Sequence, residues 1–227
     1  MVADYVIESV VSRPFEQSTF ILWKPGLKQA LVVDPGFDPR GVLQILRDEG
    51  LEPAAILNTH GHVDHIAGNR PLKEAFPAAP LVIGRGESAL LTDAEANMSA
   101  ACGLPITSPP ADLLVDDGDV LEIAGFRLVV REIPGHSPGS VVYLSQETSP
   151  PFVLGGDVVF AGSVGRTDLG GDFALLARGV QQKLWPLADE TIIYPGHGPA
   201  TTIGHEKRTN PYVGAPARGL DSPGESQ

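Results

Sequence analysis

The chain has 227 residues, a formal net charge of −12 at pH 7 and 42% hydrophobic residues, a composition typical of a globular protein long enough to bury a sizeable core. The acidic balance argues against a nucleic-acid partner, because binding of the phosphate backbone needs clustered Lys and Arg. The single cysteine, Cys102, excludes an internal disulfide framework. No apolar run approaches the length of a membrane span, and the first residues lack the pattern of a secretory signal. We therefore expect a cytoplasmic protein with no membrane partner.

The first part of the chain alternates β-rich runs with helical patterns. Asp38 and Pro39 have the character of an N-cap followed by the first helical position, and apolar residues then recur at helical spacing up to Gly50. A second helical pattern opens at Ile66 and runs through Phe76. The strands expected here are residues 5–11, 19–23, 30–33, 54–57 and 80–83.

The second part begins with residues 84–118, whose periodicity is weaker and which we interpret as a helix plus a long loop. We expect residues 84–110 to border the mouth of the site and to help select the substrate. A helix is expected over 172–184, and the Gly-, Pro- and Ser-rich tail 214–227 is expected to be disordered, which leaves one domain over 1–213. The strands expected here are residues 120–123, 126–133, 140–144, 152–154 and 191–194.

Four strong metal ligands stand within six positions, directly after the apolar run 54–57. Side chains this close point in different directions unless a cation draws them together. The cluster falls on a predicted strand-to-helix turn, where α/β proteins place their chemistry. Half of the six histidines in the chain lie here, so chance is a poor explanation. The four residues are His60, His62, Asp64 and His65.

Three further potential ligands occur in the same local context. His136, Asp157 and His197 each follow a predicted strand directly, and each is flanked by small residues that let the backbone approach closely. Taken singly, each of them is as well explained as an ordinary turn residue. Their agreement with the first cluster favours a common metal site.

The Thr-His-x-His-x-Asp-His pattern at 59–65, followed in order by Gly-His, Gly-Asp and Gly-His, resembles the metallo-β-lactamase-fold hydrolases over 19–210. The resemblance implies an α/β fold with four layers, an αββα sandwich of two mixed β-sheets flanked by helices. It also implies two adjacent metal sites bridged by Asp157, with Asp64 and Asp157 as catalytic carboxylates. One site would use His60, His62 and His136, and the other Asp64, His65 and His197.

Nitrogen and carboxylate ligands suit Zn²⁺, Fe²⁺ or Mn²⁺ and do not choose among them. We expect two divalent metal ions per chain, with zinc as the preferred assignment and Fe or Mn as alternatives. Such a pair, typically about 3.5–4 Å apart, can hold a hydroxide between the metals as the nucleophile and stabilise an oxyanion. No Ser or Cys nucleophile is then required.

Within this family, the segments 162–168 and 198–206 resemble the short form of glyoxalase II-like (hydroxyacylglutathione hydrolase-like) enzymes. That resemblance implies hydrolysis of S-lactoylglutathione or a related acyl-thiol, with Arg166 in the region that contacts the thiol carrier. A structural ion pair explains Arg166 equally well. Longer relatives grip glutathione with a C-terminal helical domain, which we do not expect in this chain, so the identity of the thiol stays open.

Two alternatives stay open at this point. Persulfide dioxygenases share the fold and hold one iron with two histidines and a carboxylate, which here match His60, His136 and Asp157; they also carry an element like Gly-Arg-Thr-Asp at 165–168. The second alternative is hydrolysis of another ester, a lactam or a phosphodiester.

Overall fold

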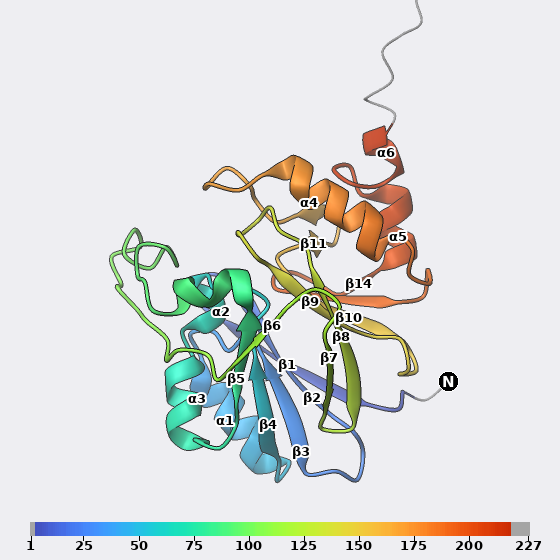
Figure 1. Cartoon of the computed structure of the whole chain (residues 1–227). Coiled ribbons are helices and arrows are strands. Elements are labelled where there is room, and N and C mark those ends of the chain that lie inside the picture. Colours follow the sequence, from blue (N-terminus) through green and yellow to red (C-terminus); the bar gives the residue numbers. More distant parts are fainter. Residues whose placement is uncertain (1–2, 219–227) are drawn as a thin grey trace, which may run out of the picture.

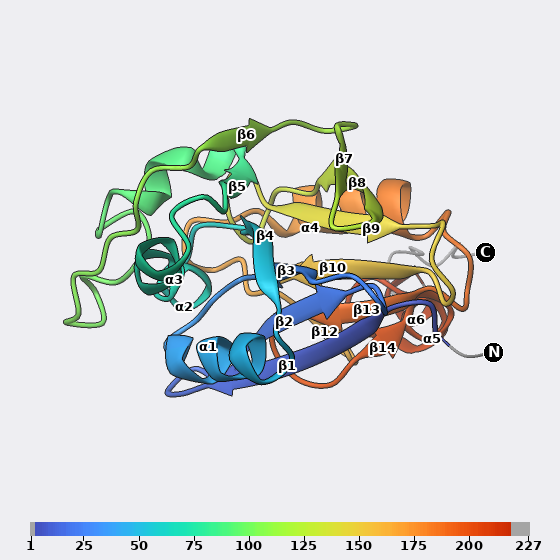
Figure 2. The same ribbon diagram turned by 90° about the horizontal axis from the view of Figure 1, so that it is seen from below.

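The computed structural model describes residues 3–218, in which two six-stranded β-sheets lie face to face with helices on their outer sides (Figures 1 and 2). The predicted four-layer αββα sandwich is therefore confirmed. Within 3–218 no helix is both long and apolar enough to cross a membrane.

The first sheet has the strand order of the sequence, from β1 to β6. Its first three strands form the predicted antiparallel meander, and β3 to β6 are parallel. The crossovers between these parallel strands include the helices α1 (Pro39–Asp48), α2 (Val63–Ile66), α3 (Asn69–Ala75) and the short 3₁₀ helix η1 (Arg85–Leu91). The strands are β1 (Val6–Ser12), β2 (Gln17–Trp23), β3 (Gln29–Val33), β4 (Glu52–Leu57), β5 (Leu81–Gly84) and β6 (Leu113–Val115).

The second sheet has the order β14-β13-β10-β9-β8-β7, and its parallel pair is β10 with β13. The crossover between them contains a small hairpin, β11 (Val159–Phe160) and β12 (Ser163–Val164), then α4 (Phe173–Gly179) and a π-helical turn, η2 (Val180–Leu184). Two helices, α5 (Ile203–Thr209) and α6 (Ala215–Arg218), follow the last strand. The strands are β7 (Val120–Ile123), β8 (Phe126–Glu132), β9 (Val141–Ser145), β10 (Phe152–Gly156), β13 (Ile192–Pro195) and β14 (Thr201–Thr202).

The side-chain alternation of the strands explains the four layers. In β3, Leu31 and Val33 point between the sheets, whereas Val32 points outward to α1 and α3. In β9, Tyr143 belongs to the central core and Leu144 to the outer core under α4 and η2. Because both faces of these strands are buried, they appear in the sequence as continuous apolar runs.

Several short elements escaped prediction. The strands β6, β11, β12 and β14 have two or three residues each, too few for a periodic signal. The helix expected over 172–184 is present as α4 continued by η2, with Asp172 as its N-cap. The tail expected to be disordered from Gly214 begins with α6, which corrects that expectation for 215–218, and residues 219–227 lie outside the described part of the chain.

Candidate metal centre

All seven predicted ligands converge at one end of the sandwich, at the C-terminal ends of strands. His60 follows β4, and His62, Asp64 and His65 stand at the start of α2. The remaining three follow β8, β10 and β13, as the sequence pattern predicts. The second sheet holds the loop after β4 in place, because the amide of Val141 donates to the Thr59 carbonyl at 2.8 Å.

The first triad brings His60, His62 and His136 together, with one ligand atom of each within 4.8 Å of the others. Nδ1 of His62 lies 2.9 Å from Nε2 of His136. The ring of His60 stands nearly perpendicular to both, with centroids 4.7 Å and 4.9 Å away. Three imidazole nitrogens that face a common point match the donor set of a divalent transition metal.

The second triad consists of Asp64, His65 and His197. Oδ2 of Asp64 lies 3.2 Å from Nε2 of His197 and 3.7 Å from Nε2 of His65. His65 is fully buried, whereas His197 is partly exposed on the open side. This set is also suited to a divalent ion, with one carboxylate to offset part of its charge.

Asp157 lies between the two triads. Its Oδ2 is 3.5 Å from Nε2 of His136 in the first triad and 3.5 Å from Nε2 of His197 in the second. Its Oδ1 is 3.3 Å from Nε2 of His65. One carboxylate therefore faces both triads, as a bridging ligand must.

Hydrogen bonds at the far side of the rings fix which nitrogens carry lone pairs toward the centre. Nδ1 of His136 donates to the Arg166 carbonyl at 2.8 Å, and Nδ1 of His197 donates to the Phe15 carbonyl at 3.1 Å. A neutral imidazole has one N–H, so in the neutral form that binds metal both rings would present the lone pair of Nε2 to the centre.

The rings of His60 and His65 are oriented through one buried carboxylate, Asp34. Nδ1 of His65 lies 3.0 Å from Asp34 Oδ2. The Thr59 hydroxyl donates to the same oxygen at 2.6 Å and lies 3.1 Å from Nδ1 of His60, from which it can accept. Both rings therefore also direct Nε2 inward.

Three buried polar atoms at this point find no hydrogen-bond partner within residues 3–218: Nε2 of His60, Nε2 of His65 and Oδ1 of Asp157. Buried polar groups are normally paired, and an orphaned one calls for an explanation. An atom that binds a metal ion directs its lone pair at the ion and needs no hydrogen-bond partner in the protein. The donor set and the orphaned atoms thus fit a metal centre.

Burial and mutual repulsion keep part of the cluster neutral. Burial, together with the nearby His136 and His65, lowers the pKa of His62 to about 4, and burial with the neighbouring rings lowers the pKa of His60 well below its usual value. Burial alone would also lower the pKa of His65, but the carboxylates of Asp157 and Asp64 raise it above its usual range. His60 and His62 are thus in the form that binds metal.

The two carboxylates are held in the ionised form. Burial acts to raise the pKa of Asp157 and of Asp64, but the charge of His65 and the other neighbouring rings outweigh it, and both pKa values fall below the ordinary range. Negative charge is therefore available where two cations would lie.

Two supporting residues were missed in the sequence. Asp34 is followed by Pro35 and Gly36, a sequence typical of a turn, yet it comes directly after β3 and so meets the criterion that found His136, Asp157 and His197. Glu87 is fully buried and accepts from the amides of Gly61 and Gly139, at 2.8 and 2.5 Å, and from the Ser137 hydroxyl at 2.8 Å. It ties together the two loops that carry His62 and His136, and no local signal pointed to it.

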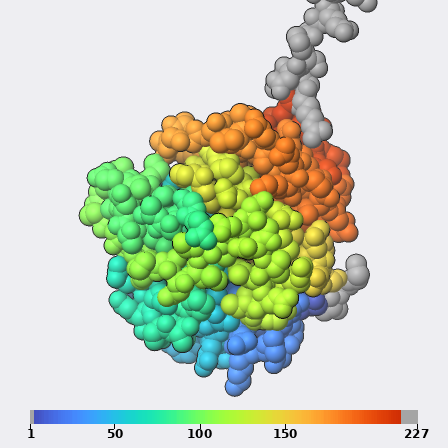
Figure 3. All heavy atoms as spheres, in the orientation of Figure 1, coloured from blue at the N-terminus to red at the C-terminus, as the bar shows by residue number. Residues whose placement is uncertain are grey.

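A cavity of about 440 Å³ opens above the seven residues. Asn97, Met98 and Cys102 line it, so the expectation that residues 84–110 border the mouth is confirmed. The border starts later than expected, because residues 85–91 form η1 and include the buried Glu87 and Leu91. The segments around residues 100 and 170, light green and orange, lie at the same end of the molecule (Figure 3).

Arg166 lines the same cavity, but its guanidinium is engaged. Nε and Nη2 donate to the two carboxylate oxygens of Asp168 at 2.8 Å and 2.7 Å. Both side chains are largely exposed, 60% and 67%, so the pair is weak in free energy. The backbone of Arg166 has a firmer role, as the acceptor for His136.

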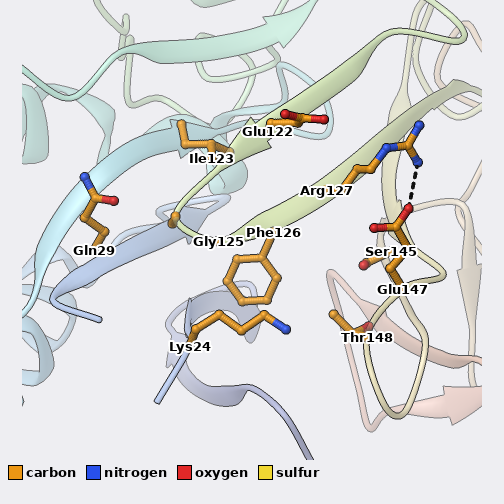
Figure 4. Close-up of a pocket in the computed structure, with 11 residues that line it drawn as sticks. Lys24, Gln29, Glu122, Ile123, Gly125, Phe126, Arg127, Ser145, Glu147 and Thr148 are labelled. Atoms are coloured by element: carbon orange, nitrogen blue, oxygen red, sulfur yellow. Dashed lines mark ion pairs between the residues drawn. The ribbon is translucent and has the colours of Figure 1, made fainter. Parts of the chain in front are cut away.

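A second hollow lies near the β7–β8 hairpin and carries no comparable chemistry (Figure 4). Lys24 Nζ stands 5.0 Å from the centroid of the Phe126 ring, and Arg127 pairs with Glu147 at 3.4 Å. The residues that line it include no histidine. The candidate site is therefore the cavity above the ligand cluster.

Residues 13–197 match the model of the metallo-beta-lactamase superfamily. The chain therefore belongs to the metallo-β-lactamase superfamily and is a metallo-hydrolase. A curated relative, hydroxyacylglutathione hydrolase GloC of Haemophilus influenzae, is 34% identical over 211 residues, which cover 91% of this chain and 97% of that protein.

Solved structures agree with this assignment. The crystal structure of BLEG-1 B3 metallo-beta-lactamase superposes with a TM-score of 0.87 at 38% identity, covering 92% of this chain and 99% of that one. The structure of TTHA1623 in a di-iron-bound form gives a TM-score of 0.78 at 35% identity, covering 90% and 99%. Divalent metals are bound in this superfamily, which agrees with the histidine-rich cluster found here.

Proposed function

We propose that the protein is a dinuclear, metal-dependent thiolester hydrolase of the glyoxalase II-like kind, which cleaves S-lactoylglutathione or a related acyl-thiol. The observation that carries the proposal is the pair of triads with Asp157 facing both. Seven ligands exceed what one four- to six-coordinate ion needs. The likeness to GloC over nearly the whole chain supports the choice of substrate.

Divalent ions held by these residues would lower the pKa of a bound water and polarise the acyl carbonyl. Zinc is our first choice of metal, and the donor set suits iron and manganese as well. Asp34 and the Arg166 carbonyl would keep the rings of His65 and His136 oriented, and Asp157 would set the distance between the ions. One ion would be held by His60, His62 and His136, and the other by Asp64, His65 and His197, with Asp157 shared.

The overall reaction consumes one water. A bond forms between the acyl carbon and the oxygen of water, and the bond between the acyl carbon and sulfur breaks. One proton of water ends on the thiol, and the other is released when the carboxylic acid ionises. The neighbouring histidines keep Asp64 and Asp157 ionised, and these two carboxylates would orient the attacking water.

The test combines thiol release with a metal count. The wild-type protein should release free thiol from a lactoyl thiolester and contain two metal ions per chain, and Asp157→Asn should lose metal and nearly all activity. Asp48→Asn, on the outer surface of α1, is the control and should lose neither. A fully active protein with one iron, which consumes oxygen with glutathione persulfide and cleaves no thiolester, would establish the dioxygenase alternative instead.

A second candidate function, hydrolysis of a β-lactam, is favoured by the likeness to BLEG-1 B3 metallo-beta-lactamase over 99% of that chain. The same site would serve, because both reactions open an acyl bond at a polarised carbonyl. Parallel assays with nitrocefin and a thiolester separate the two functions by their kcat/KM values.

A further inference from the structure

The cavity above the ligand cluster has apolar walls contributed by separate parts of the chain. Phe15 belongs to the turn between β1 and β2, and Met98 to the loop after η1. Phe160 and Val164 come from the β11–β12 hairpin. The apolar residues that line the cavity are Phe15, Val63, Met98, Phe160, Val164 and Leu169.

Two of these residues stand open to solvent at the mouth. Phe15 is 38% exposed and Leu169 is 50% exposed. Large apolar side chains that gather around a concave site, rather than singly on the surface, mark a place where a ligand covers them. Their position predicts contact with the part of the substrate that extends out of the site.

The charged residues of the cavity also favour an apolar ligand. Among its lining residues within 3–218, Arg166 is the one Lys or Arg, and Asp168 neutralises it at 2.7 Å. A glutathione moiety carries two carboxylates and an ammonium, and each of these would need a partner on leaving water. The other charged groups at the site are Asp64, Asp157 and the histidines, which the metal centre uses.

We propose that the thiol portion of the substrate is uncharged and apolar, so that the enzyme prefers thiolesters of neutral thiols to those of glutathione. This inference rests on the proposed thiolester hydrolysis and narrows its substrate class. The acyl carbonyl lies at the metal centre, and the thiol extends between Met98 and Leu169 toward the mouth.

The first experiment compares S-lactoylglutathione with the lactoyl thiolesters of N-acetylcysteamine and of benzyl mercaptan. The neutral thiolesters should have a kcat/KM about tenfold higher or more, because a carboxylate without a partner opposes binding. A value for S-lactoylglutathione equal to or above theirs would overturn the inference and leave the thiolester hydrolase standing.

Binding without turnover separates the inference from the proposed function. The unreactive thioethers S-hexylglutathione and S-hexyl-N-acetylcysteamine can be titrated calorimetrically into the purified protein. Tighter binding of the neutral thioether supports the inference, even if no thiolester is cleaved and the proposed function fails. Tighter binding of S-hexylglutathione overturns it.

Variants of a residue at the mouth test the inference by changing the protein instead of the substrate. Leu169→Lys should lower kcat/KM for the benzyl thiolester and raise it for S-lactoylglutathione, because a cation replaces an apolar contact in the cavity. Leu27→Lys is the matched control, since Leu27 is 45% exposed on the turn between β2 and β3 and lines no part of this cavity. If both variants leave the ratio of the kcat/KM values for the two substrates unchanged, the inference is wrong.

Discussion

The carboxylate of Asp34 lies 3.0 Å from Nδ1 of His65, and both side chains are buried. Its other oxygen accepts from the amide of Thr59 at 2.7 Å, so one aspartate orients a ligand ring and the loop that precedes it. Asp34 adopts a left-handed backbone conformation, with φ at 49°, which non-glycine residues rarely do. The backbone is thus strained at the residue that orients His65, a candidate metal ligand.

Replacement of Asp34 by Asn should weaken metal binding by about 10–100-fold, the usual effect of removing the partner of a ligating histidine. The amide keeps the shape of the carboxylate but places a donor where Thr59 and His65 also donate. Competition with a chelator measures the affinity. The control is Asp38→Asn, at the N-cap of α1, which should retain wild-type affinity. Equal affinities in the two variants would contradict the role given to Asp34.

Glu87→Gln should lower the free energy of unfolding by about 1–3 kcal/mol, because a buried acceptor of three hydrogen bonds loses charge and gains a misplaced donor. It should also weaken metal binding, since Glu87 joins the loops of His62 and His136. Denaturant unfolding of the metal-free and metal-loaded protein separates the two effects. Glu95→Gln, at an exposed position in the following loop, should change neither quantity.

Gly196 permits the close approach of Asp157 and His65. A Cβ at this position would overlap Oδ1 of Asp157 and lie 2.6 Å from Cε1 of His65. Gly196→Ala should therefore deplete metal and lower stability by about 1–3 kcal/mol, the usual cost of overpacking. Gly198→Ala meets nothing within 4 Å and should cost only the strain of its positive φ, about 1 kcal/mol. Full metal content in Gly196→Ala would contradict this packing.

Asp112 should contribute an acid-sensitive part of the stability. Its pKa is held below the usual value by the hydrogen bond from the Leu81 amide and by Lys73. A carboxyl whose pKa is lower in the folded state stabilises it above the unfolded pKa, and this contribution is lost as the pH falls through the folded value. Asp112→Asn should therefore flatten the fall in unfolding free energy below pH 4. A parallel curve for wild type and variant would contradict this.

Local patterns in the sequence were sufficient to predict most strands and the seven candidate ligands, for a physical reason, whereas the four layers were implied by the family resemblance. Strands buried on both faces are continuous apolar runs, and polar residues that follow them directly meet at one sheet edge. Asp34 also follows a strand directly, but the Pro35 and Gly36 after it are typical of an ordinary turn, so its role was not predicted. Glu87 could not be found, because its importance comes from Gly61 and Gly139, which only the fold brings near. The pairing of Arg166 with Asp168 is likewise a matter of side-chain geometry.

The central claim is that two ions lie in one site, shared by Asp157. Anomalous difference scattering from crystals of the metal-loaded protein, collected at the absorption edge of the bound metal, tests it most directly. The account predicts two peaks per chain, one among His60, His62 and His136 and one beside Asp64, with Asp157 in contact with both. A single peak in a fully active protein, with Asp64 and His197 free of metal, would contradict it.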